Sequence, residues 1–321
     1  MDPIAGLGLT LRRPTLDDVE IATRLFERVD LHDTGSVDTD VDETRDEWRT
    51  ADLANDHWLV TDADGAAVGY GEVRLRRRVH LEGWVAVDPA WRRQGIGTQL
   101  ADLVEARAQG LLERTAEGAR VTLEGWVDTS SEAGVRFLAT RGMTPVRRFW
   151  RMRIDLPDEA PVQPPLPDGI AIRTLEVGVD ERATWEASED AFADHWGHVR
   201  APFEEWIHRA QGDLFDPGLW FLATHGDTIV GTALCGPWLG GGWVGSLGVR
   251  RPWRGRGIGE ALLRRAFAEF HRRERRTVAL GVDAESLTGA TRLYERAGMR
   301  VDRVYELSIR VLREGESLET A

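Results

Sequence analysis

The chain contains the motif Arg92-Arg93-Gln94-Gly95-Ile96-Gly97 and, in its second half, the matching motif Arg254-Gly255-Arg256-Gly257-Ile258-Gly259. Each copy follows a hydrophobic segment and a tryptophan, and each opens a stretch with apolar residues at helical spacing. A strand, a glycine-rich loop and a helix in this order can hold a phosphate, because closely spaced glycines let backbone N–H groups approach an anion at the helix N-terminus. Two copies in the same context are stronger evidence for a phosphate-binding loop than a single Gly-x-Gly would be.

The repeat extends beyond the two loops. Gly95 and Gly257 lie 162 positions apart (257 − 95), and the segments before them match at the same spacing. In each half these segments read as two strands joined by a polar turn, at residues 62–65 and 225–227. Within each half we predict a strand, two helices, further strands, the phosphate loop with its helix, a strand, a helix and a strand.

This order predicts two domains of the α/β (α+β) class, each a mixed β-sheet flanked by helices. The 321 residues fit about two domains, at roughly 100–200 residues per domain. We expect an N-terminal domain at residues 1–154 and a C-terminal domain at residues 169–321. Residues 155–168 are rich in proline and lack periodicity, which is typical of an extended linker.

The composition excludes several functions. The net charge of −13 argues against general nucleic-acid binding. The sequence has no lysine, so all 41 basic residues are arginine, and a P-loop lysine or a Schiff-base lysine is excluded. The one cysteine, Cys235, excludes a disulfide or a cysteine-cluster zinc site within one chain. No signal peptide or membrane span is expected, so the predicted location is cytoplasmic.

The second half continues from Leu247 through its loop to Gly259, and a later helix ends in Leu293-Tyr294-Glu-Arg-Ala-Gly-Met299. This pattern resembles the GNAT superfamily of acyl-CoA N-acyltransferases. The resemblance covers both halves, as in the tandem-GNAT architecture of mycothiol synthase. It implies that acetyl-CoA donates an acetyl group to a primary amine of a small molecule by direct attack, with no metal and no covalent enzyme intermediate.

The resemblance also implies which residues bind acetyl-CoA. In the family the strand before the loop binds the pantetheine arm through its backbone, and the loop binds the pyrophosphate. In the second half the matching residues are Leu247, Gly248, Val249, Arg254, Gly255, Arg256, Gly257, Ile258 and Gly259. In the first half they are Val85, Val87, Arg92, Arg93, Gln94, Gly95, Ile96, Gly97 and Thr98. Whether the first half still binds the cofactor stays open.

Tyr294 matches the general acid of the family. A departing thiolate is expelled more easily when it is protonated, and a phenol can supply that proton. An amine acceptor must also lose a proton before it attacks, so a general base is needed. Asp283 and Glu285 are candidates for it, and so are three residues of the early helices in the second half, Glu189, Asp194 and His195. A water chain that ends at a backbone carbonyl would serve as well.

Three positions depart from the family pattern. Ser286 stands where an asparagine often contacts the cofactor, and it can cap a helix or make a weaker polar contact. Trp243 stands where mycothiol synthase has a glutamate. Leu138 of the first half aligns with Tyr294. We therefore expect the C-terminal domain to be catalytic and the N-terminal domain to lack turnover.

The acceptor amine is not identified by the sequence. Residues 30–47 hold eight acids and one arginine, either a rim that attracts a cationic amine or an ordinary solvated run. The second half has an aromatic-rich equivalent, either a wall for an apolar acceptor or a cover for the sheet: Trp185, Phe192, His195, Trp196, His198, Phe203 and Trp206. The alternative function is a non-catalytic acyl-CoA or small-molecule binding protein. A monomer or a homodimer is expected.

Overall fold

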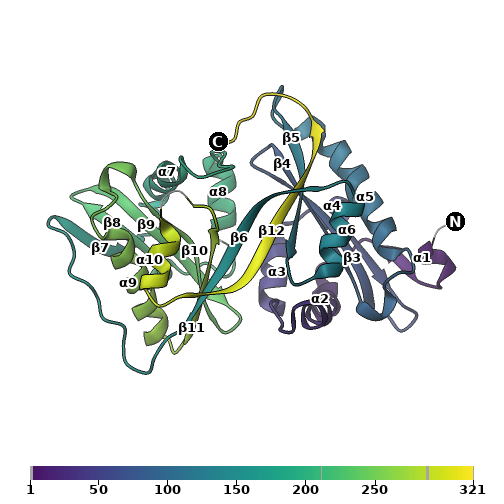
Figure 1. Cartoon of the computed structure of the whole chain (residues 1–321), viewed down its shortest axis with the longest axis horizontal. Helices are drawn as coiled ribbons and strands as arrows, with labels where there is room; N and C mark the ends of the chain where they lie inside the picture. The colour runs from purple at the N-terminus through teal and green to yellow at the C-terminus, as the bar shows by residue number, and fades with distance from the viewer. Residues whose placement is uncertain (1–2, 211, 287–288, 321) are drawn as a thin grey trace. The chain divides into compact units, whose positions relative to one another are not determined.

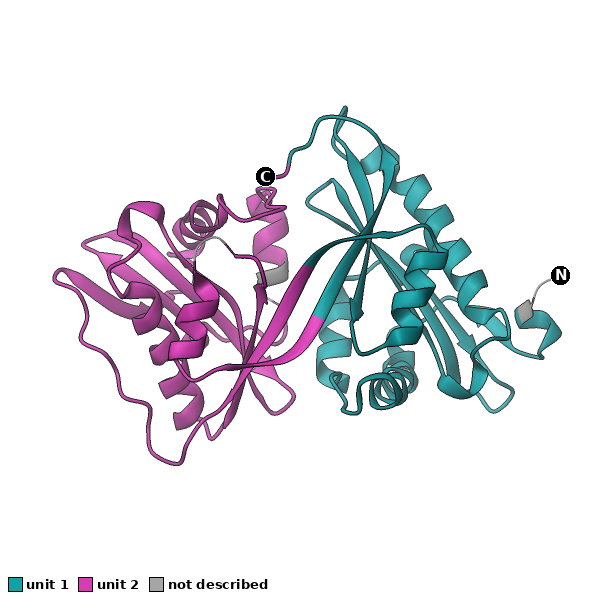
Figure 2. Cartoon of the chain, in the orientation of Figure 1, with its two compact units in different colours: residues 1–147, 305–318 teal, residues 148–304, 319–321 magenta. Residues whose placement is uncertain are grey.

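The computed structural model describes residues 3–210, 212–286 and 289–320. These residues form two compact units, which Figure 2 colours separately. The first unit comprises residues 1–147 and 305–318, and the second comprises residues 148–304 and 319–321. Each unit holds one mixed β-sheet with helices against it, and this confirms the predicted fold class. In the second repeat the order of helices and strands is the predicted one, whereas the first repeat has two short helices that were not predicted, α1 (Pro3–Gly6) before β1 and α4 (Leu53–Asp56) before β2.

The first unit builds its sheet in the order β1-β2-β3-β4-β5-β12. Among the described residues of this unit, β4 and β5 pair in parallel and the other strand pairs are antiparallel. The strands, which Figure 1 labels, are β1 (Thr10–Arg12), β2 (His57–Thr61), β3 (Ala67–Arg76), β4 (His80–Val87), β5 (Val121–Asp128) and the end of β12 (Arg300–Arg313). The helices are α1 (Pro3–Gly6), α2 (Val19–Thr34), α3 (Val41–Thr50), α4 (Leu53–Asp56), α5 (Ile96–Gly110) and α6 (Glu132–Thr140).

The second unit repeats this plan in the order β6-β11-β10-β9-β8-β7, and only β10 and β11 are parallel. Its strands are β6 (Thr144–Asp155), β7 (Ile170–Thr174), β8 (Trp220–His225), β9 (Thr228–Trp238), β10 (Gly241–Val249) and β11 (Thr277–Asp283). Its helices are α7 (Glu181–Phe192), α8 (Phe203–Ala210), α9 (Ile258–Arg272) and α10 (Ala290–Arg296).

The units differ from the predicted domain boundaries at the last strand of each repeat. Residues 149–155 of β6 follow the first repeat, yet they pair with β11 of the second unit. Residues 305–313 of β12 follow the second repeat, yet they pair with β5 of the first unit. Figure 2 shows the change of colour within both strands. The two strands come last in equivalent repeats, so each fits the edge that the other would cover.

Each sheet has a hydrophobic core on both faces. In the first unit, Leu100 and Val104 of α5 lie in the core of one face, and Leu25 and Phe26 of α2 lie in the core of the other. In the second unit the apolar side of the helix α9 lies in the core, where Phe267 and Phe270 are fully buried. This burial follows the helical spacing of apolar residues that predicted α5 and α9.

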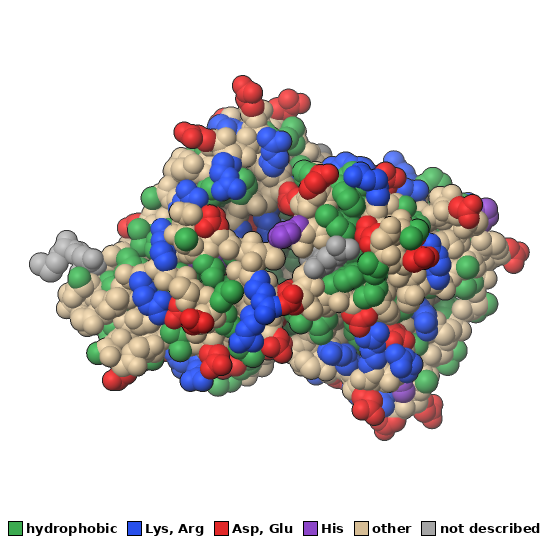
Figure 3. Space-filling view, turned by 180° about the vertical axis from the view of Figure 1, so that it is seen from behind, with side chains coloured by type: hydrophobic (Ala, Val, Ile, Leu, Met, Phe, Trp, Pro, Cys, Tyr) green, Lys and Arg blue, Asp and Glu red, His purple; other side chains and the backbone are tan. Residues whose placement is uncertain are grey.

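The predicted linker, residues 155–168, runs without helix or strand beyond Asp155. It lies against α9, because the Asp158 carbonyl is 2.9 Å from Nε2 of His271 and Gln163 donates to the Arg264 carbonyl at 2.7 Å. Figure 3 shows basic and acidic side chains interspersed over the face of the molecule that it draws. None of the helices in the described ranges is long and apolar enough to cross a membrane.

Candidate active site

The site of the second unit begins where two parallel strands separate. β10 pairs with β11 from Gly242 to Val244, and the described residues show no pairing of the two strands beyond that point. β10 nevertheless continues to Val249, with β9 on its other side and an irregularity in register between Val244 and Ser246. The edge of β10 that faces away from β9 therefore carries backbone N–H and C=O groups that a ligand can use.

Gly248 lies on this open edge and has no room for a side chain. A Cβ atom there would stand 2.7 Å from the Cβ of Ala191 and 3.0 Å from the ring of Phe192, both on α7. The close approach of α7 to β10 therefore requires glycine at this position. The predicted cofactor residues Leu247, Gly248 and Val249 all line one cavity.

The glycine-rich loop forms the second wall of the cavity. Gly257 is the N-cap of α9 and has φ of +82°, and Gly255 has φ of +72°. Such backbone conformations favour glycine, and they turn the chain directly into the helix. The first-turn N–H groups of a helix have no partner within the helix, so they can bind an anion together with the helix dipole. Ile258 is buried beneath the loop and anchors it.

The loop arginines bind the protein itself. Nε of Arg254 donates to the Val249 carbonyl at 3.0 Å, and its Nη atoms donate to Asp194 at 2.6 Å and to the Ala191 carbonyl at 2.8 Å. Arg256 lies over the ring of Trp253, with 4.8 Å between its guanidinium carbon and the ring centroid. Arg254 therefore fastens the loop to the end of α7, and its guanidinium group is engaged within the protein.

Tyr294 of α10 lines the same cavity. Its side chain is 6% exposed, and burial raises the pKa of its hydroxyl group to about 12. Among the described residues no hydrogen-bond partner of this hydroxyl is found. A phenol with this pKa stays protonated at neutral pH, so it can donate a proton or a hydrogen bond to a ligand atom. The position agrees with the role that the family resemblance implies.

Among the base candidates, His195 lines the cavity. It follows α7, and its ring lies 4.5 Å from that of Phe192, centroid to centroid. Burial lowers the pKa of its imidazole, and the positive charges of Arg254 and His198 lower it further. The imidazole is therefore neutral at pH 7 and can accept a proton.

The other base candidates are placed elsewhere. Glu189 is buried, accepts a hydrogen bond from the Ala201 amide at 3.2 Å, and has its Oε2 3.2 Å from Nε2 of His198. Asp194 is the partner of Arg254. Asp283 ends β11 and Glu285 follows it, and neither is among the cavity's lining residues. Ser286, the expected cofactor contact, also lies outside the lining, and its amide donates to the Asp283 carbonyl.

The completed cavity measures about 320 Å³, which is within the usual range for a small-molecule site. Its wall combines the open strand edge, the glycine-rich loop, the end of α7 and one face of α10. The lining residues are Ala191, His195, Leu247, Gly248, Val249, Trp253, Arg254, Gly255, Gly257, Ile258, Gly259, Glu260, Gly289, Ala290, Leu293, Tyr294 and Arg296.

The first unit repeats this arrangement. β4 pairs with β5 only from His80 to Glu82 among the described residues, and Gly95, the N-cap of α5, has φ of +91°. The resulting cavity of about 300 Å³ is lined by Val29, Asp33, Val85, Ala86, Val87, Arg92, Arg93, Gly95, Gly97, Thr98, Ala133, Gly134 and Phe137. The predicted residues Gln94 and Ile96 are not in this lining, since Gln94 is exposed and Ile96 is fully buried.

The first unit has no phenol at the position of Tyr294. Leu138 stands there and packs over Gly125 beside Met143, and it does not line the cavity. The contacts that hold the loop in the second unit are repeated here: Arg92 donates to Asp33 at 2.6 Å and to the Val87 carbonyl at 3.1 Å. The sequence did not indicate that Asp33 and Asp194 hold these loops, since Asp194 was predicted only as a possible base and Asp33 only as part of the acidic run at residues 30–47. A signal for these contacts is present in the sequence: the acid and the loop arginine lie 59 positions apart in the first repeat and 60 in the second.

Most of the aromatic set in the second unit covers the sheet. Trp206 is buried in a core cluster with Trp220, and Phe203 stacks on Trp206. Nε1 of Trp185 donates to the Ala201 carbonyl. His195 is the member of the set that lines the cavity. Within residues 3–210, 212–286 and 289–320, no group of three or more His, Cys, Asp or Glu side chains could hold a metal ion.

Comparison with known proteins identifies the family to which the chain belongs. The family model described as "Acetyltransferase (GNAT) family" matches residues 23–143 and 181–299, one match in each repeat. The chain is 35% identical to a mycothiol acetyltransferase of Thermobispora bispora over 226 residues, which cover 67% of this chain and 71% of the relative. It is 33% identical to a mycothiol acetyltransferase of Kytococcus sedentarius, over 75% of this chain and 77% of the relative.

Solved structures also place the chain among the GNAT acetyltransferases. The structure of a GCN5-related N-acetyltransferase from Sphaerobacter thermophilus superposes with a TM-score of 0.83 at 39% identity and covers 99% of this chain and 98% of that one. A tandem GNAT protein from the clavulanic acid biosynthesis pathway shares the fold, with a TM-score of 0.68 at 18% identity over 96% of this chain and 100% of that one. The resemblance drawn from the sequence is thereby confirmed.

Proposed function

We propose a specific catalytic site for this chain, which belongs to the acetyltransferase (GNAT) family and is an N-acetyltransferase that uses acetyl-CoA. In this proposal the second unit transfers the acetyl group to a primary amine of a small molecule. The observation that supports it is one cavity in which the open edge of β10, the Gly257 loop and the buried phenol of Tyr294 come together. The alternative of a non-catalytic binding protein is not favoured.

The residues of the cavity fit acetyl-CoA, which supplies the activated acetyl group as a thioester. Backbone groups of Leu247 and Val249, on the strand edge that lines the cavity, would bind an extended arm in the manner of an added strand. The amides from Gly255 to Gly259 would hold the pyrophosphate at the start of α9. Arg254 keeps the loop in place through Asp194 and Val249.

Two side chains of the cavity can move the protons that the reaction needs. His195, neutral at pH 7, takes a proton from the acceptor ammonium, so that the amine nitrogen can form a bond to the carbonyl carbon. As the carbon–sulfur bond breaks, Tyr294 donates its hydroxyl proton to the sulfur. The nitrogen then loses its second proton to the Tyr294 phenolate, which restores the phenol, and His195 releases the first proton to solvent. Free CoA and an amide are the products, with the net release of one proton.

The acceptor remains a proposal at the level of its class. Amino sugars, mycothiol-like thiol precursors, aminoglycosides and peptide amines are the compounds to be assayed. The relatives named mycothiol acetyltransferase put the mycothiol-like amines first. A cytoplasmic location and a non-catalytic first unit are parts of the same proposal.

A panel of amines, assayed by the release of free thiol from acetyl-CoA, tests the proposed function. We expect one amine class to accelerate thiol release in the wild-type protein, and little acceleration in the Tyr294→Phe variant. If no amine in the panel accelerates thiol release, the proposed acceptor class is wrong. If the variant is as active as the wild type, the proposed site is wrong.

A further inference from the structure

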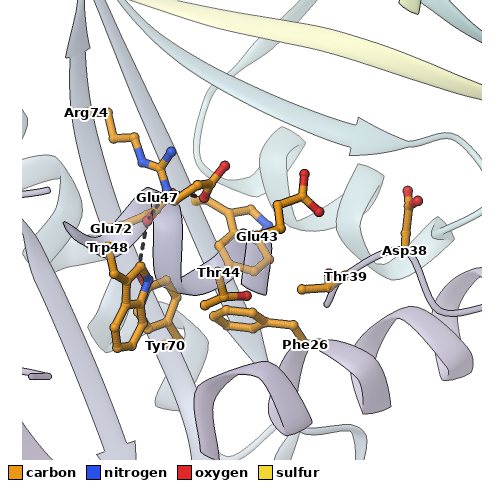
Figure 4. Close-up of a pocket in the computed structure, with 11 residues that line it drawn as sticks. Phe26, Asp38, Thr39, Glu43, Thr44, Glu47, Trp48, Tyr70, Glu72 and Arg74 are labelled. Carbon is orange, nitrogen blue, oxygen red and sulfur yellow. Dashed lines mark hydrogen bonds and ion pairs between the residues drawn. The ribbon is translucent and has the colours of Figure 1, made fainter. Parts of the chain in front are cut away.

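The first unit holds a second cavity, of about 250 Å³, that the acetyl-transfer site does not use (Figure 4). It lies between α2, α3 and the sheet strands β3 and β4. The residues that line it are Phe26, Asp38, Thr39, Glu43, Thr44, Glu47, Trp48, Tyr70, Glu72, Arg74 and Trp84. Its lining thus contains four aromatic rings and four carboxyl groups with a single arginine.

The four aromatic rings pack against one another as a continuous wall. Phe26 meets the edges of Tyr70 and Trp84, with ring centroids 5.0 and 4.8 Å apart. Trp48 stacks on Tyr70 at 5.7 Å. Tyr70 and Trp48 are almost fully buried, whereas Trp84 is 37% exposed and forms the rim. Figure 4 shows the rings of Phe26, Trp48 and Tyr70 on one side of the acidic side chains.

A buried chain of polar groups sets the position of Glu72 at the base of the cavity. The Tyr70 hydroxyl donates to Oε2 of Glu72 at 2.8 Å, and it lies 2.6 Å from Nδ1 of His57. On its other side, Arg74 donates to Glu72 and to Glu47, both at 2.9 Å. Glu72 and Glu47 therefore share the one guanidinium group of the cavity.

Glu43 has no such compensation. Among the described residues its carboxyl group forms no hydrogen bond or ion pair, and only its backbone amide is bonded, to Asp40. Burial and, to a smaller extent, the charges of Glu47, Asp40 and Asp38 together raise the pKa of this carboxyl group to about 7. Arg74, the one cation in the lining, is engaged by Glu47 and Glu72, and the Tyr305 hydroxyl donates to Asp38. The cavity thus has an excess of negative charge that a cation would compensate.

We propose that this cavity binds a small organic ammonium ion, held between the carboxylate of Glu43 and the rings of Trp48 and Trp84. Aromatic faces and carboxylates both attract an alkylammonium group, and the aromatic wall accommodates its carbon atoms. A hard metal ion would instead require a shell of oxygen ligands, which a wall of four rings does not provide. The volume of the cavity limits the ligand to a small molecule.

The site is separate from catalysis in this protein, since the first unit has Leu138 in place of the phenol. It lies beside the cleft of the first unit: Trp84 lines the cation cavity, and the next residues, Val85 to Val87, line that cleft. The ammonium ion is therefore bound without being acetylated in this unit.

Choline is a suitable probe, because its quaternary nitrogen has no proton to exchange for an acetyl group. Its neutral isostere, 3,3-dimethylbutan-1-ol, controls for burial of the carbon atoms alone. Binding to the full chain is measured by calorimetry, and the indole N–H signals of Trp48 and Trp84 in NMR spectra report whether the ligand enters this cavity. We expect choline to shift these two signals and the neutral isostere to bind at least 10-fold more weakly.

The variant Glu43→Gln removes the uncompensated charge and keeps the shape, so choline affinity should fall about 10-fold. Asp42→Asn is the matched control, since Asp42 is the exposed neighbour of Glu43 on α3 and does not line the cavity. It should retain the wild-type affinity. The proposal is overturned if the isostere binds as tightly as choline, if Glu43→Gln has no effect, or if Asp42→Asn weakens binding equally. The thiol-release assay should be unaffected in both variants, so this test is independent of the proposed function.

Discussion

Arg254 donates a hydrogen bond from Nη1 to Oδ2 of Asp194 at 2.6 Å, and this contact ties the glycine-rich loop to the end of α7. Arg92 and Asp33 make the equivalent contact in the first unit. Since the same arginine also donates to the carbonyl of the strand before the loop, it fixes the loop on two sides. The anion-binding backbone of the loop is therefore preorganised before a ligand arrives.

Loss of this contact should weaken acetyl-CoA binding. In Asp194→Ala we expect KM for acetyl-CoA to rise about 10-fold with little change in kcat, because a mobile loop must be ordered on binding. Steady-state kinetics checks this. The matched control is Asp190→Ala on the same helix, which removes exposed ion pairs to Arg200 and Arg250 and does not line the cavity. Equal effects of the two substitutions would contradict the claim that the contact between Arg254 and Asp194 orders the loop for acetyl-CoA binding.

Removal of the phenol should slow the chemical step. In Tyr294→Phe we expect kcat to fall by about 10²–10⁴-fold, because the thiolate must leave without a proton, while the affinity for acetyl-CoA is nearly intact. Phenylalanine keeps the packing of the buried ring, so the fold should survive. Calorimetric titration with acetyl-CoA and steady-state kinetics measure the two quantities. An unchanged kcat removes Tyr294 from the mechanism.

The pH dependence should report His195. Because its pKa lies below the usual 6.5, the neutral form is already dominant at pH 7, and kcat/KM should be flat above neutral pH and fall as the pH drops through that pKa. The His195→Gln variant should lose this acidic limb and lower the plateau by about 10²-fold. A pH profile of kcat/KM for both proteins decides it. If the limb persists in the variant, another group is the base.

The two glycine-rich loops should differ in their effect on activity. Gly257→Val and Gly95→Val each place a branched side chain at a backbone with φ of +82° or +91°. We expect Gly257→Val to abolish acetyl transfer and Gly95→Val to retain most of it, because only the second unit has the phenol. Activity and acetyl-CoA titration are measured for both variants. The reverse pattern would assign catalysis to the first unit.

Glu43 should make the first unit less stable at alkaline pH. Its folded-state pKa of about 7 lies above the usual 4.5, so its ionised form is disfavoured by folding. This penalty is absent below the unfolded pKa and is fully present above pH 7. Glu43→Gln should therefore stabilise the protein at pH 8, by about 1–3 kcal/mol, and the gain should vanish near pH 4. Denaturant unfolding at the two pH values tests this. A gain of equal size at both would contradict the raised pKa.

The glycine-rich loops, their helices and the two-fold repeat are predictable from the sequence, because each rests on short-range preferences. Gly95 and Gly257 adopt positive φ where the loops require it, and apolar spacing places the buried faces of α5 and α9. The strand pairs around residues 62–65 and 225–227 also follow the prediction. The alignment of Leu138 with Tyr294 is local in the same sense, since both lie on the helix before a Gly-Met pair.

The sequence by itself thus determined the fold class and the family, and it predicted the segments that we propose to bind acetyl-CoA, since these depend on residues close together along the chain. Only the tertiary structure decided which side chains meet in the cavity. His195 and Tyr294 lie 99 positions apart, and their joint presence depends on how α7 and α10 pack on the sheet. The same holds for the final strands, because β6 pairs with β11 and β12 pairs with β5, partners that lie far from them along the chain. The aromatic and acidic cavity also depends on the tertiary structure. Sheet register places Glu72 of β3 beside Trp84 of β4, and the packing of α3 on the sheet brings Glu43 to the same cavity.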